Sequence, residues 1–307
     1  MPKWEELWSR FERRDRLALA RLLTRISRGE SLSDIRHHLA ELKARGASKG
    51  GSARVFAFTG AGGVGKSTLV GKMIEAFRAA GKTVAVLACD PESPLTGGAL
   101  LGDRLRMPPR PDDDGLFVRS VAAISGHEAV AEHLDLMIDL LEAFGFDIIL
   151  IETVGAGQGD TAVRFLADAM VVMVQPEAGD DIQWEKAGLL EVADVVVVHK
   201  ADLPGADRTE AQVKTLLNLP GCRDVPVHRV SSAKNQGLME LRDRLLSLPT
   251  RRGKEPKSLA QLNRLIMEQL EEHQRSRPTQ WEELLAHWQA GTQSAAVTLK
   301  HALAMLK

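Results

Sequence analysis

The stretch Gly60-Ala61-Gly62-Gly63-Val64-Gly65-Lys66-Ser67 decides the fold, because it matches the phosphate-binding pattern G-x-x-x-x-G-K-[ST] at every position. It follows an apolar run at 55–58 that predicts a strand, and it opens a helical pattern that runs to Ala80. The glycines let backbone N–H groups turn inward around phosphate oxygens, and the helix N-terminus adds partial positive charge. Lys66 can bring a full charge to the β- and γ-phosphates, and the Ser67 hydroxyl can ligate Mg²⁺. The sequence therefore predicts a nucleotide-binding P-loop, with contact residues Gly62, Gly63, Val64, Gly65, Lys66, Ser67 and Thr68.

Short β-branched runs recur beyond the P-loop and alternate with helical patterns. They lie at 84–88, 148–151, 170–174, 195–198 and 225–227. Runs of this kind are typical of strands that are buried on both faces, and so of a parallel sheet covered by helices. We predict an α/β fold of the P-loop NTPase class, with a mostly parallel sheet flanked by helices.

Helical patterns precede and follow this region, which divides the chain into three parts. Residues 1–50 predict N-terminal helices that end in a small-residue linker, 52–250 the P-loop domain, and 251–307 a C-terminal helical extension. Asp15 and Ser31 are candidate helix N-caps, and 279–282 reads as a capping box. One apolar stripe of the first part consists of Leu17, Leu19, Leu22, Leu23 and Ile26.

The composition indicates in which compartment the protein works and which classes of partner it does not bind. The 307 residues include 40 Lys and Arg against 41 Asp and Glu, so there is no basic excess for nucleic-acid binding. No apolar run approaches the roughly 20 residues of a membrane span, and the mixed, charged N-terminus is unlike a secretory signal. Cys89 and Cys222 are too few for a disulfide framework. We expect a cytoplasmic protein that binds neither nucleic acid nor membrane.

Two segments that follow later strands favour guanine as the base. His199-Lys200-Ala201-Asp202 is similar to the Asn-Lys-x-Asp of guanine binders. The Asp202 carboxylate can accept hydrogen bonds from both guanine N1–H and N2–H₂, and adenine has no such donor pair. The stem of Lys200 can lie along the base, and backbone N–H groups of Ser231-Ser232-Ala233-Lys234 could meet guanine O6. Because His199 stands where Asn is usual, we expect weaker guanine affinity than usual.

Acidic residues at the ends of predicted strands are candidates for the metal site. Asp90 and Glu152 each end a strand, and Asp103 follows Asp90 after a short interval. In a parallel sheet such residues can hold Mg²⁺ with its waters and orient the attacking water. Each could instead cap a helix, and for Asp103 the two interpretations are evenly balanced. The candidate metal set is Ser67, Asp90, Asp103 and Glu152.

Together these motifs resemble the MeaB/ArgK family of G-proteins, to which the methylmalonic aciduria type A protein belongs. The resemblance spans about 16–248. It rests on the P-loop, Asp90-Pro91 and the segments 16–21 (RLALAR), 97–103 (GGALLGD), 152–158 (ETVGAGQ), 178–183 (AGDDIQ) and 200–202 (KAD). The segment at 152–158 is quite specific, because signal-recognition GTPases would have Asp-Thr-Ala-Gly there. Trp184 departs from the family, which commonly has glycine there, and could be a partner contact or a core anchor.

The resemblance implies a Mg²⁺-dependent GTPase that is slow alone and is activated by an adenosylcobalamin-dependent acyl-CoA mutase. Such proteins bind GTP or GDP, meet adenosylcobalamin only through the mutase, and couple hydrolysis to cofactor loading or protection. They are homodimers joined through C-terminal helices. Asp180 to Lys186 maps onto a switch that enters the site when the mutase docks, so Lys186 could stabilise transition-state charge. The candidate catalytic residues are Lys66, Glu152, Asp103, Lys186 and Asp180.

Two other functions remain open from the sequence. A metallochaperone GTPase of the nickel-insertion kind shares this fold class but needs a soft-metal site of Cys and His. The two cysteines are isolated, and His37 and His38 are adjacent on a helix and so do not face one ligand. A nucleotide-gated scaffold would bind GTP without hydrolysing it. The identity of the acyl-CoA mutase stays open as well.

Overall fold

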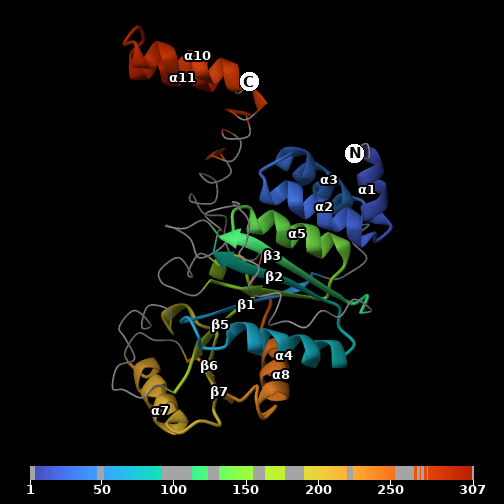
Figure 1. Ribbon diagram of the computed structural model, residues 1–307, viewed down its shortest axis with the longest axis vertical. Coiled ribbons are helices and arrows are strands. Elements are labelled where there is room, and N and C mark those ends of the chain that lie inside the picture. The colour runs from blue at the N-terminus through green and yellow to red at the C-terminus, as the bar shows by residue number, and fades with distance from the viewer. Residues whose placement is uncertain are drawn as a thin grey trace.

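The computed structural model describes residues 4–46, 52–91, 113–123, 131–154, 163–176, 190–219, 224–252, 266–267, 270, 273–274 and 276–305. These residues form a central sheet with helices on both faces (Figure 1). A helical hairpin near the C-terminus stands apart from the sheet in the same view.

Within the described ranges the sheet has seven strands, all parallel, in the order β3-β2-β4-β1-β5-β6-β7. Their bounds are β1 (Arg54–Gly60), β2 (Val84–Pro91), β3 (Leu116–Ala123), β4 (Ile148–Glu152), β5 (Ala169–Val174), β6 (Val195–His199) and β7 (Val227–Val230). The strand β1 lies at the centre, between β4 and β5, and therefore delivers the P-loop to the middle of one sheet edge. The predicted α/β fold with a parallel sheet is confirmed.

The two edge strands differ from the sequence prediction. The strand β3 carries Arg119 and Ser120 in its middle and is only partly buried, so it lacks the continuous apolar run that identifies a central strand. The strand β7 begins at Val227, two residues later than the start of the run expected at 225–227. Pro226 has no N–H to donate to a ladder, and its carbonyl alone accepts a bond, from the Val196 N–H.

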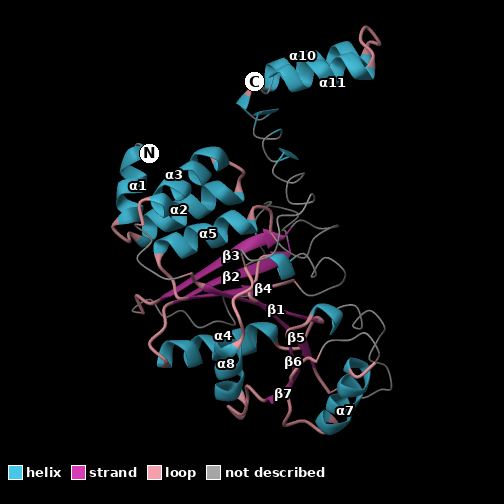
Figure 2. Cartoon of the chain, turned by 180° about the vertical axis from the view of Figure 1, so that it is seen from behind, coloured by secondary structure: helices cyan, strands magenta, loops and turns pink. Residues whose placement is uncertain are grey.

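Alternate residues of the strands build two different cores. Phe58 of β1 and Leu150 of β4 face the helices α4 (Lys66–Ala79) and α8 (Leu238–Ser247). Ala57 and Ile151, from the same two strands, belong to the core under α5 (Leu134–Phe144). Over β5 and β6, the same face of the sheet is covered by α7 (Ala206–Leu217). The view from behind shows α5 and α4 on opposite sides of the sheet (Figure 2).

Three N-terminal helices form an extra layer outside α5: α1 (Trp4–Glu12), α2 (Arg16–Ser27) and α3 (Leu32–Ala44). Asp15 caps α2 as predicted, since its Oδ1 accepts from the Leu17 N–H at 2.8 Å. Ser31 occupies the N-cap position of α3 but has left-handed backbone angles and makes no capping side-chain bond, so its predicted role is wrong.

The helix α2 gives a matched test of core packing. Leu22 is fully buried at 0% exposure, whereas Leu17, which the periodicity also assigned to the apolar stripe, is 51% exposed. We expect Leu22→Ala to lower the free energy of unfolding by about 2–5 kcal/mol, because it removes buried methyl groups and leaves a cavity. Leu17→Ala should change it by about 0.5 kcal/mol or less. Urea unfolding of both variants checks this, and equal midpoint shifts would contradict the packing described for α2.

The C-terminal hairpin consists of α10 (Pro278–Gln289) and α11 (Ala295–Met305), which pack on each other. The expected capping box at Thr279 does not form, because α10 already begins at Pro278, whose fixed φ suits the first helical position. Large apolar side chains cover its outside: Leu285, Trp288, Val297, Leu299 and Leu303 are all 43–61% exposed. The hairpin thus presents an apolar surface that the described residues of its own chain leave uncovered.

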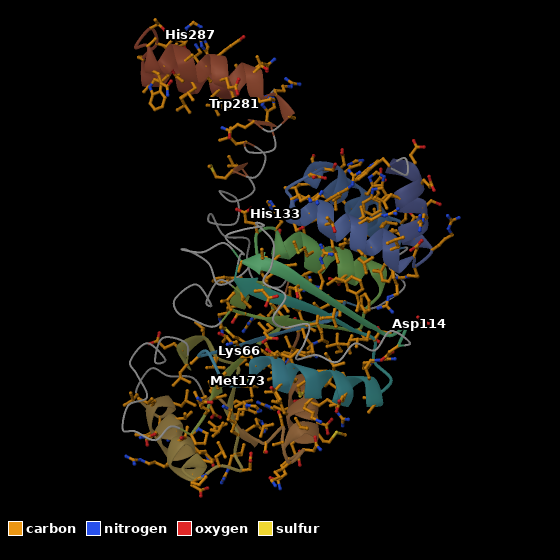
Figure 3. All side chains as sticks on the ribbon, viewed as in Figure 1. Lys66, Asp114, His133, Met173, Trp281 and His287 are labelled. Carbon is orange, nitrogen blue, oxygen red and sulfur yellow. The ribbon has the colours of Figure 1, made fainter. Side chains whose placement is uncertain are left out.

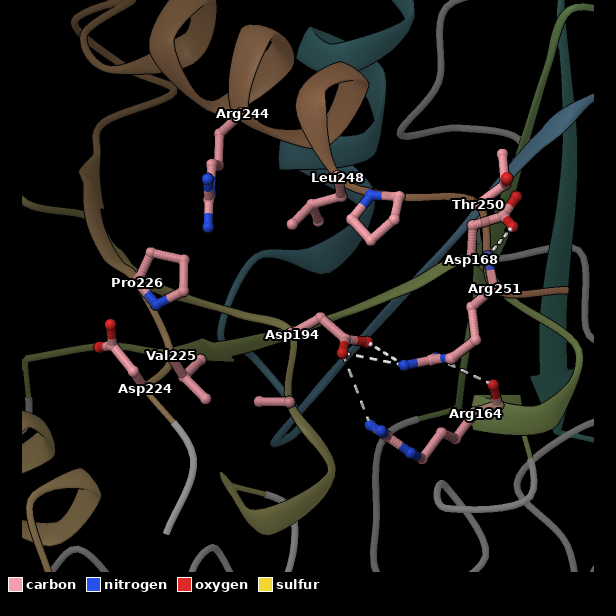
Figure 4. Close-up of a pocket in the computed structure, with 12 residues that line it drawn as sticks. Arg164, Asp168, Asp194, Asp224, Val225, Pro226, Arg244, Leu248, Thr250 and Arg251 are labelled. Atoms are coloured by element: carbon pink, nitrogen blue, oxygen red, sulfur yellow. Dashed lines mark hydrogen bonds and ion pairs between the residues drawn. The ribbon is translucent and has the colours of Figure 1, made fainter. Parts of the chain in front are cut away.

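The chain that leaves α8 is anchored at the amino-terminal edge of the sheet (Figure 4). Arg251 donates to both carboxylate oxygens of Asp194 at 2.9 Å, and the backbone N–H groups of Arg251 and Arg252 donate to Asp168 Oδ1. A cavity of about 420 Å³ lies beside this ion pair. Asp168 and Asp194 immediately precede β5 and β6, so the cavity is at the sheet edge opposite to the P-loop and is not part of the nucleotide site.

Candidate functional site

The P-loop joins the end of β1 to the start of α4, and two of its glycines combine a positive φ with a close contact. Gly60 has φ +147°, and a Cβ there would lie 2.5 Å from the Met173 carbonyl oxygen on β5. Gly65 has φ +95°, and a Cβ there would lie 2.7 Å from the His199 ring. Figure 3 labels Lys66 and Met173 at this edge of the sheet. Both glycines therefore allow the loop to pack closely against its neighbours, and both allow a positive φ.

Lys66 is directed into the loop that precedes it. Its side chain is only 8% exposed, and its Nζ donates to the carbonyls of Gly60 at 2.8 Å and Ala61 at 3.2 Å. The ammonium group therefore lies inside the concave turn, where the phosphates of a nucleotide would come to rest. The loop, the lysine and the N-terminus of α4 together create a region of positive potential for an anion.

Hard oxygen donors gather beside the first turn of α4. The Ser67 hydroxyl donates to Glu152 Oε1 at 2.7 Å, and both residues are buried. Glu152 ends β4 opposite Ala88 of β2, and Asp90 lies two residues beyond Ala88 and is buried too. A hydroxyl and two carboxylates suit Mg²⁺, which is usually held by one or two carboxylates, by waters and by substrate phosphates. No group of three or more His, Cys, Asp or Glu that could hold a metal by itself occurs among the described residues.

The ends of β5 and β6 bring a second lysine to the P-loop. Lys200 has a left-handed φ of 55°, and its Nζ donates to the Gly63 carbonyl at 3.0 Å and to Gln175 Oε1 at 2.7 Å. Gln175 directly follows β5 and was not singled out from the sequence. Its position just after a buried strand, at the same edge as Asp90 and Glu152, is the signal that could have identified it.

Asp202 is held by the loop that follows β7. Its Oδ1 accepts a hydrogen bond from the Ser231 hydroxyl, and this bond lowers the pKa of the Asp202 carboxyl below its usual value. The Ser231 Oγ in turn accepts from the Lys234 N–H at 3.1 Å, and Ser231 and Gln236 exchange two backbone bonds. The turn that carries Ser232, Ala233 and Lys234 is therefore closed, and the carboxylate beside it stays ionised and exposed. The sequence analysis gave Ser231 only a backbone role, and its side-chain contact with Asp202 was not predicted.

Most candidate residues meet at one edge. The P-loop, Asp90, Glu152, the segment 199–202 and the turn at 231–236 all lie at the carboxyl ends of the strands. The candidates Asp103, Asp180 and Lys186 fall outside the described residues, as do Trp184 and the glycine segment 155–157. Their predicted roles stay predictions.

A strand, a P-loop and a helix at the centre of a parallel sheet, with Lys200 and Asp202 beside the loop, define a P-loop GTP-binding protein. Within that class, the chain belongs to the family described as methylmalonyl-CoA mutase-associated GTPase MeaB, whose profile matches residues 19–278. This confirms the family resemblance inferred from the motifs. No helix among the described residues is long and apolar enough to span a membrane.

Individual relatives agree with this assignment. A candidate GTPase of Pyrococcus abyssi (strain GE5 / Orsay) is 39% identical over 249 residues, which cover 78% of this chain and 74% of that one. A fused isobutyryl-CoA mutase of Cupriavidus metallidurans is 35% identical over 195 residues, which cover 62% of this chain and 17% of the fusion protein.

Two solved structures are similar in fold alone. A protein described as an LAO/AO transport system kinase has a TM-score of 0.56 at 20% identity, and the match covers 100% of this chain and 99% of that one. HypB from Helicobacter pylori, solved in complex with nickel, has a TM-score of 0.51 at 20% identity over 69% of this chain and 94% of its own.

Proposed function

We propose that this protein is a GTP-hydrolysing chaperone of an adenosylcobalamin-dependent acyl-CoA mutase, and that it couples hydrolysis to loading or protection of the mutase cofactor. The observation that carries the proposal is the relative in which a segment similar to this chain is fused to isobutyryl-CoA mutase. Fusion keeps two activities at high effective concentration, which is useful when the two parts act on each other.

The site supports GTP hydrolysis by positioning and by charge. Lys66 would leave the loop carbonyls to contact β- and γ-phosphate oxygens, and the backbone N–H groups around Gly63 and Gly65 would hold the same phosphates. Ser67 would ligate Mg²⁺, while Asp90 and Glu152 would bind its waters. Mg²⁺ would neutralise the charge that develops between the β- and γ-phosphates. With no covalent step on the protein, geometry and electrostatics supply the catalysis.

Partner activation is assigned to the segment that follows β5. We propose that Asp180 and Lys186 complete the site when the mutase docks, because they follow β5 in the sequence and β5 ends at the same edge of the sheet as the P-loop. Asp103 would join the metal network from the segment after β2. A slow rate alone and a faster rate with the partner would follow, since the charge of Lys186 would be added to the transition state only in the complex.

A homodimer is proposed through the C-terminal hairpin. Trp288 on α10 and Leu299 and Leu303 on α11 are more than half exposed. Exposed apolar side chains gathered on a two-helix unit are typical of an interaction surface. A second copy of the hairpin would bury them in a four-helix arrangement.

The experiment compares GTP and ATP hydrolysis with and without an acyl-CoA mutase, and methylmalonyl- and isobutyryl-CoA mutases are the first two to try. We expect the partner mutase to raise the GTP rate at least about tenfold, or 1.4 kcal/mol of barrier, and to leave ATP hydrolysis unchanged. The Lys66→Ala chain serves as the background control. If neither mutase changes the GTP rate, the chaperone proposal loses its support.

The alternatives predict different results. A nucleotide-gated scaffold would bind GTP and show no hydrolysis even with the mutase. A nickel-insertion GTPase would bind Ni²⁺ tightly in a metal titration. The likeness to HypB is a likeness in fold alone. No specific observation favours nickel insertion over the chaperone function.

A further inference from the structure

His199 joins two loops that are far apart in the sequence. It ends β6 and is only 3% exposed. Its Nδ1 lies 2.7 Å from the carbonyl oxygen of Val64 in the P-loop, and its Nε2 lies 2.7 Å from the hydroxyl oxygen of Ser232 in the turn after β7. The ring also packs against Gly65, where a Cβ would come within 2.7 Å of it.

The partners of the ring determine where its hydrogen lies. The Val64 carbonyl can only accept a hydrogen bond, so Nδ1 must carry the hydrogen. A neutral ring then has an acceptor at Nε2, and the Ser232 hydroxyl must donate to it. Burial lowers the pKa of His199, and the hydrogen bond to the Val64 carbonyl opposes this shift. The nearby charge of Lys200 lowers the pKa further, Asp202 raises it less, and the net shift is downward. These influences together favour the neutral ring.

We propose that His199 is a positioning residue that fixes the phosphate loop and the base loop at one separation, through Val64 on one side and Ser232 on the other. A guanine nucleotide spans both loops, because its phosphates lie against 60–67 and its base lies against 231–234. Its affinity therefore depends on whether the loops are already at the right distance. A link that holds them there removes part of the ordering cost of binding. The inference rests on the proposed binding of guanine nucleotides.

A double-mutant cycle tests the link. GDP affinity is measured by titration calorimetry for the wild type, His199→Ala, Ser232→Ala and the double variant. We expect each single change to weaken GDP binding about tenfold, and the double variant to be no weaker than the weaker single variant, because either change already breaks the bridge. His37→Ala and Ser247→Ala, at exposed positions on α3 and α8, are the matched controls and should bind GDP as the wild type does.

The variant His199→Asn separates the link from a general loss of folding. The amide nitrogen of Asn is as many bonds from Cα as Nδ1 of His, so it can donate to the Val64 carbonyl, whereas nothing in Asn corresponds to Nε2. We expect GDP affinity between those of the wild type and His199→Ala. In the Asn background, Ser232→Ala should have little further effect.

The protonation state is a second and independent readout. In ¹⁵N-histidine NMR of the GDP-free protein, the His199 ring should be neutral with hydrogen on Nδ1 at pH 7.5, and its pKa should lie below the ordinary histidine value of about 6.5. Additive single effects, unchanged GDP affinity in His199→Ala, or a His199 pKa at or above the ordinary value would each overturn the inference. A wild-type chain that binds no GDP would instead overturn the proposed function.

Discussion

Replacing Lys66 with alanine is expected to lower kcat/KM for GTP by about 10²- to 10³-fold, the usual loss when one preorganised charge or donor at the transition state is removed. Lys66 is the lysine whose ammonium group already lies against the carbonyls of Gly60 and Ala61 inside the P-loop. No movement of the backbone is needed to bring it to a phosphate. The loss should fall on hydrolysis and on GTP affinity together, because the β-phosphate is contacted in both the bound and the transition states.

The same helix provides the matched control for this prediction. Lys72 is six residues beyond Lys66 on α4, or about 1.7 turns, and pairs with Glu75 at 3.4 Å on the surface. Lys72→Ala removes the same side chain from the same helix and should change kcat/KM by less than about twofold, as expected for a half-exposed ion pair remote from the site. Single-turnover hydrolysis with enzyme in excess over GTP measures both variants. If Lys66→Ala kept more than a tenth of the wild-type rate, the assigned role of Lys66 would be untenable.

The central fold could be predicted because its signals are local. Each of β1, β4, β5 and β6 is a run of apolar residues buried on both faces, and the P-loop fixes the junction of β1 and α4. Of the two edge strands, β3 was not predicted and β7 was predicted a few residues too early, because neither is a continuous apolar run. Each has one neighbour only, so it tolerates polar residues such as Arg119 and His228. The sequence pattern of an edge strand is therefore close to that of a loop.

The residues of the site could be predicted from the sequence, but the contacts between them could not. The motifs around Lys66, Glu152 and Asp202 were identifiable because their residue types are tied to phosphate, metal and base. The contact of Lys200 with Gln175 was not, because it depends on β5 and β6 being neighbours in the sheet. The order of strands in a parallel sheet is set by crossover connections, which no short pattern in the sequence records.

Helical periodicity predicts which face of a helix is apolar, but it does not predict what that face packs against. It assigned Leu17 to the buried stripe of α2, yet the N-terminal helices pack so that this residue faces outward. Leu299 and Leu303 lie one turn apart on α11, and the described residues of the chain leave both exposed. Amphipathicity says that a face will be covered, and only tertiary or quaternary structure decides by what.

Asp202→Asn is the second large effect that we expect: a loss of about 100-fold or more in GDP affinity, together with a gain for xanthosine diphosphate. In the wild type the carboxylate can accept from guanine N1–H and N2–H₂ at once, and bonds to a charged partner are each worth about 1.5–3 kcal/mol. The amide of the variant keeps one acceptor and presents its N–H₂ to the guanine amino group, which is a clash of donors. Xanthine has a carbonyl at that place, so the same amide N–H₂ finds an acceptor.

Displacement of a fluorescent GDP analogue by GDP, XDP, IDP and ADP measures this change in specificity. IDP lacks only the 2-amino group, so its weaker binding to the wild type reports that one hydrogen bond, and Asp202→Asn should bring IDP and GDP close together. Asp207→Asn, a neighbouring exposed carboxylate that pairs with Arg229, is the matched control and should leave all four affinities unchanged. Equal losses for GDP and ADP would mean that Asp202 acts by holding the turn at Ser231 rather than by contacting the base. A gain for XDP cannot arise from a loosened turn, because a loosened turn would weaken every nucleotide, and it is therefore the result that assigns Asp202 to guanine recognition.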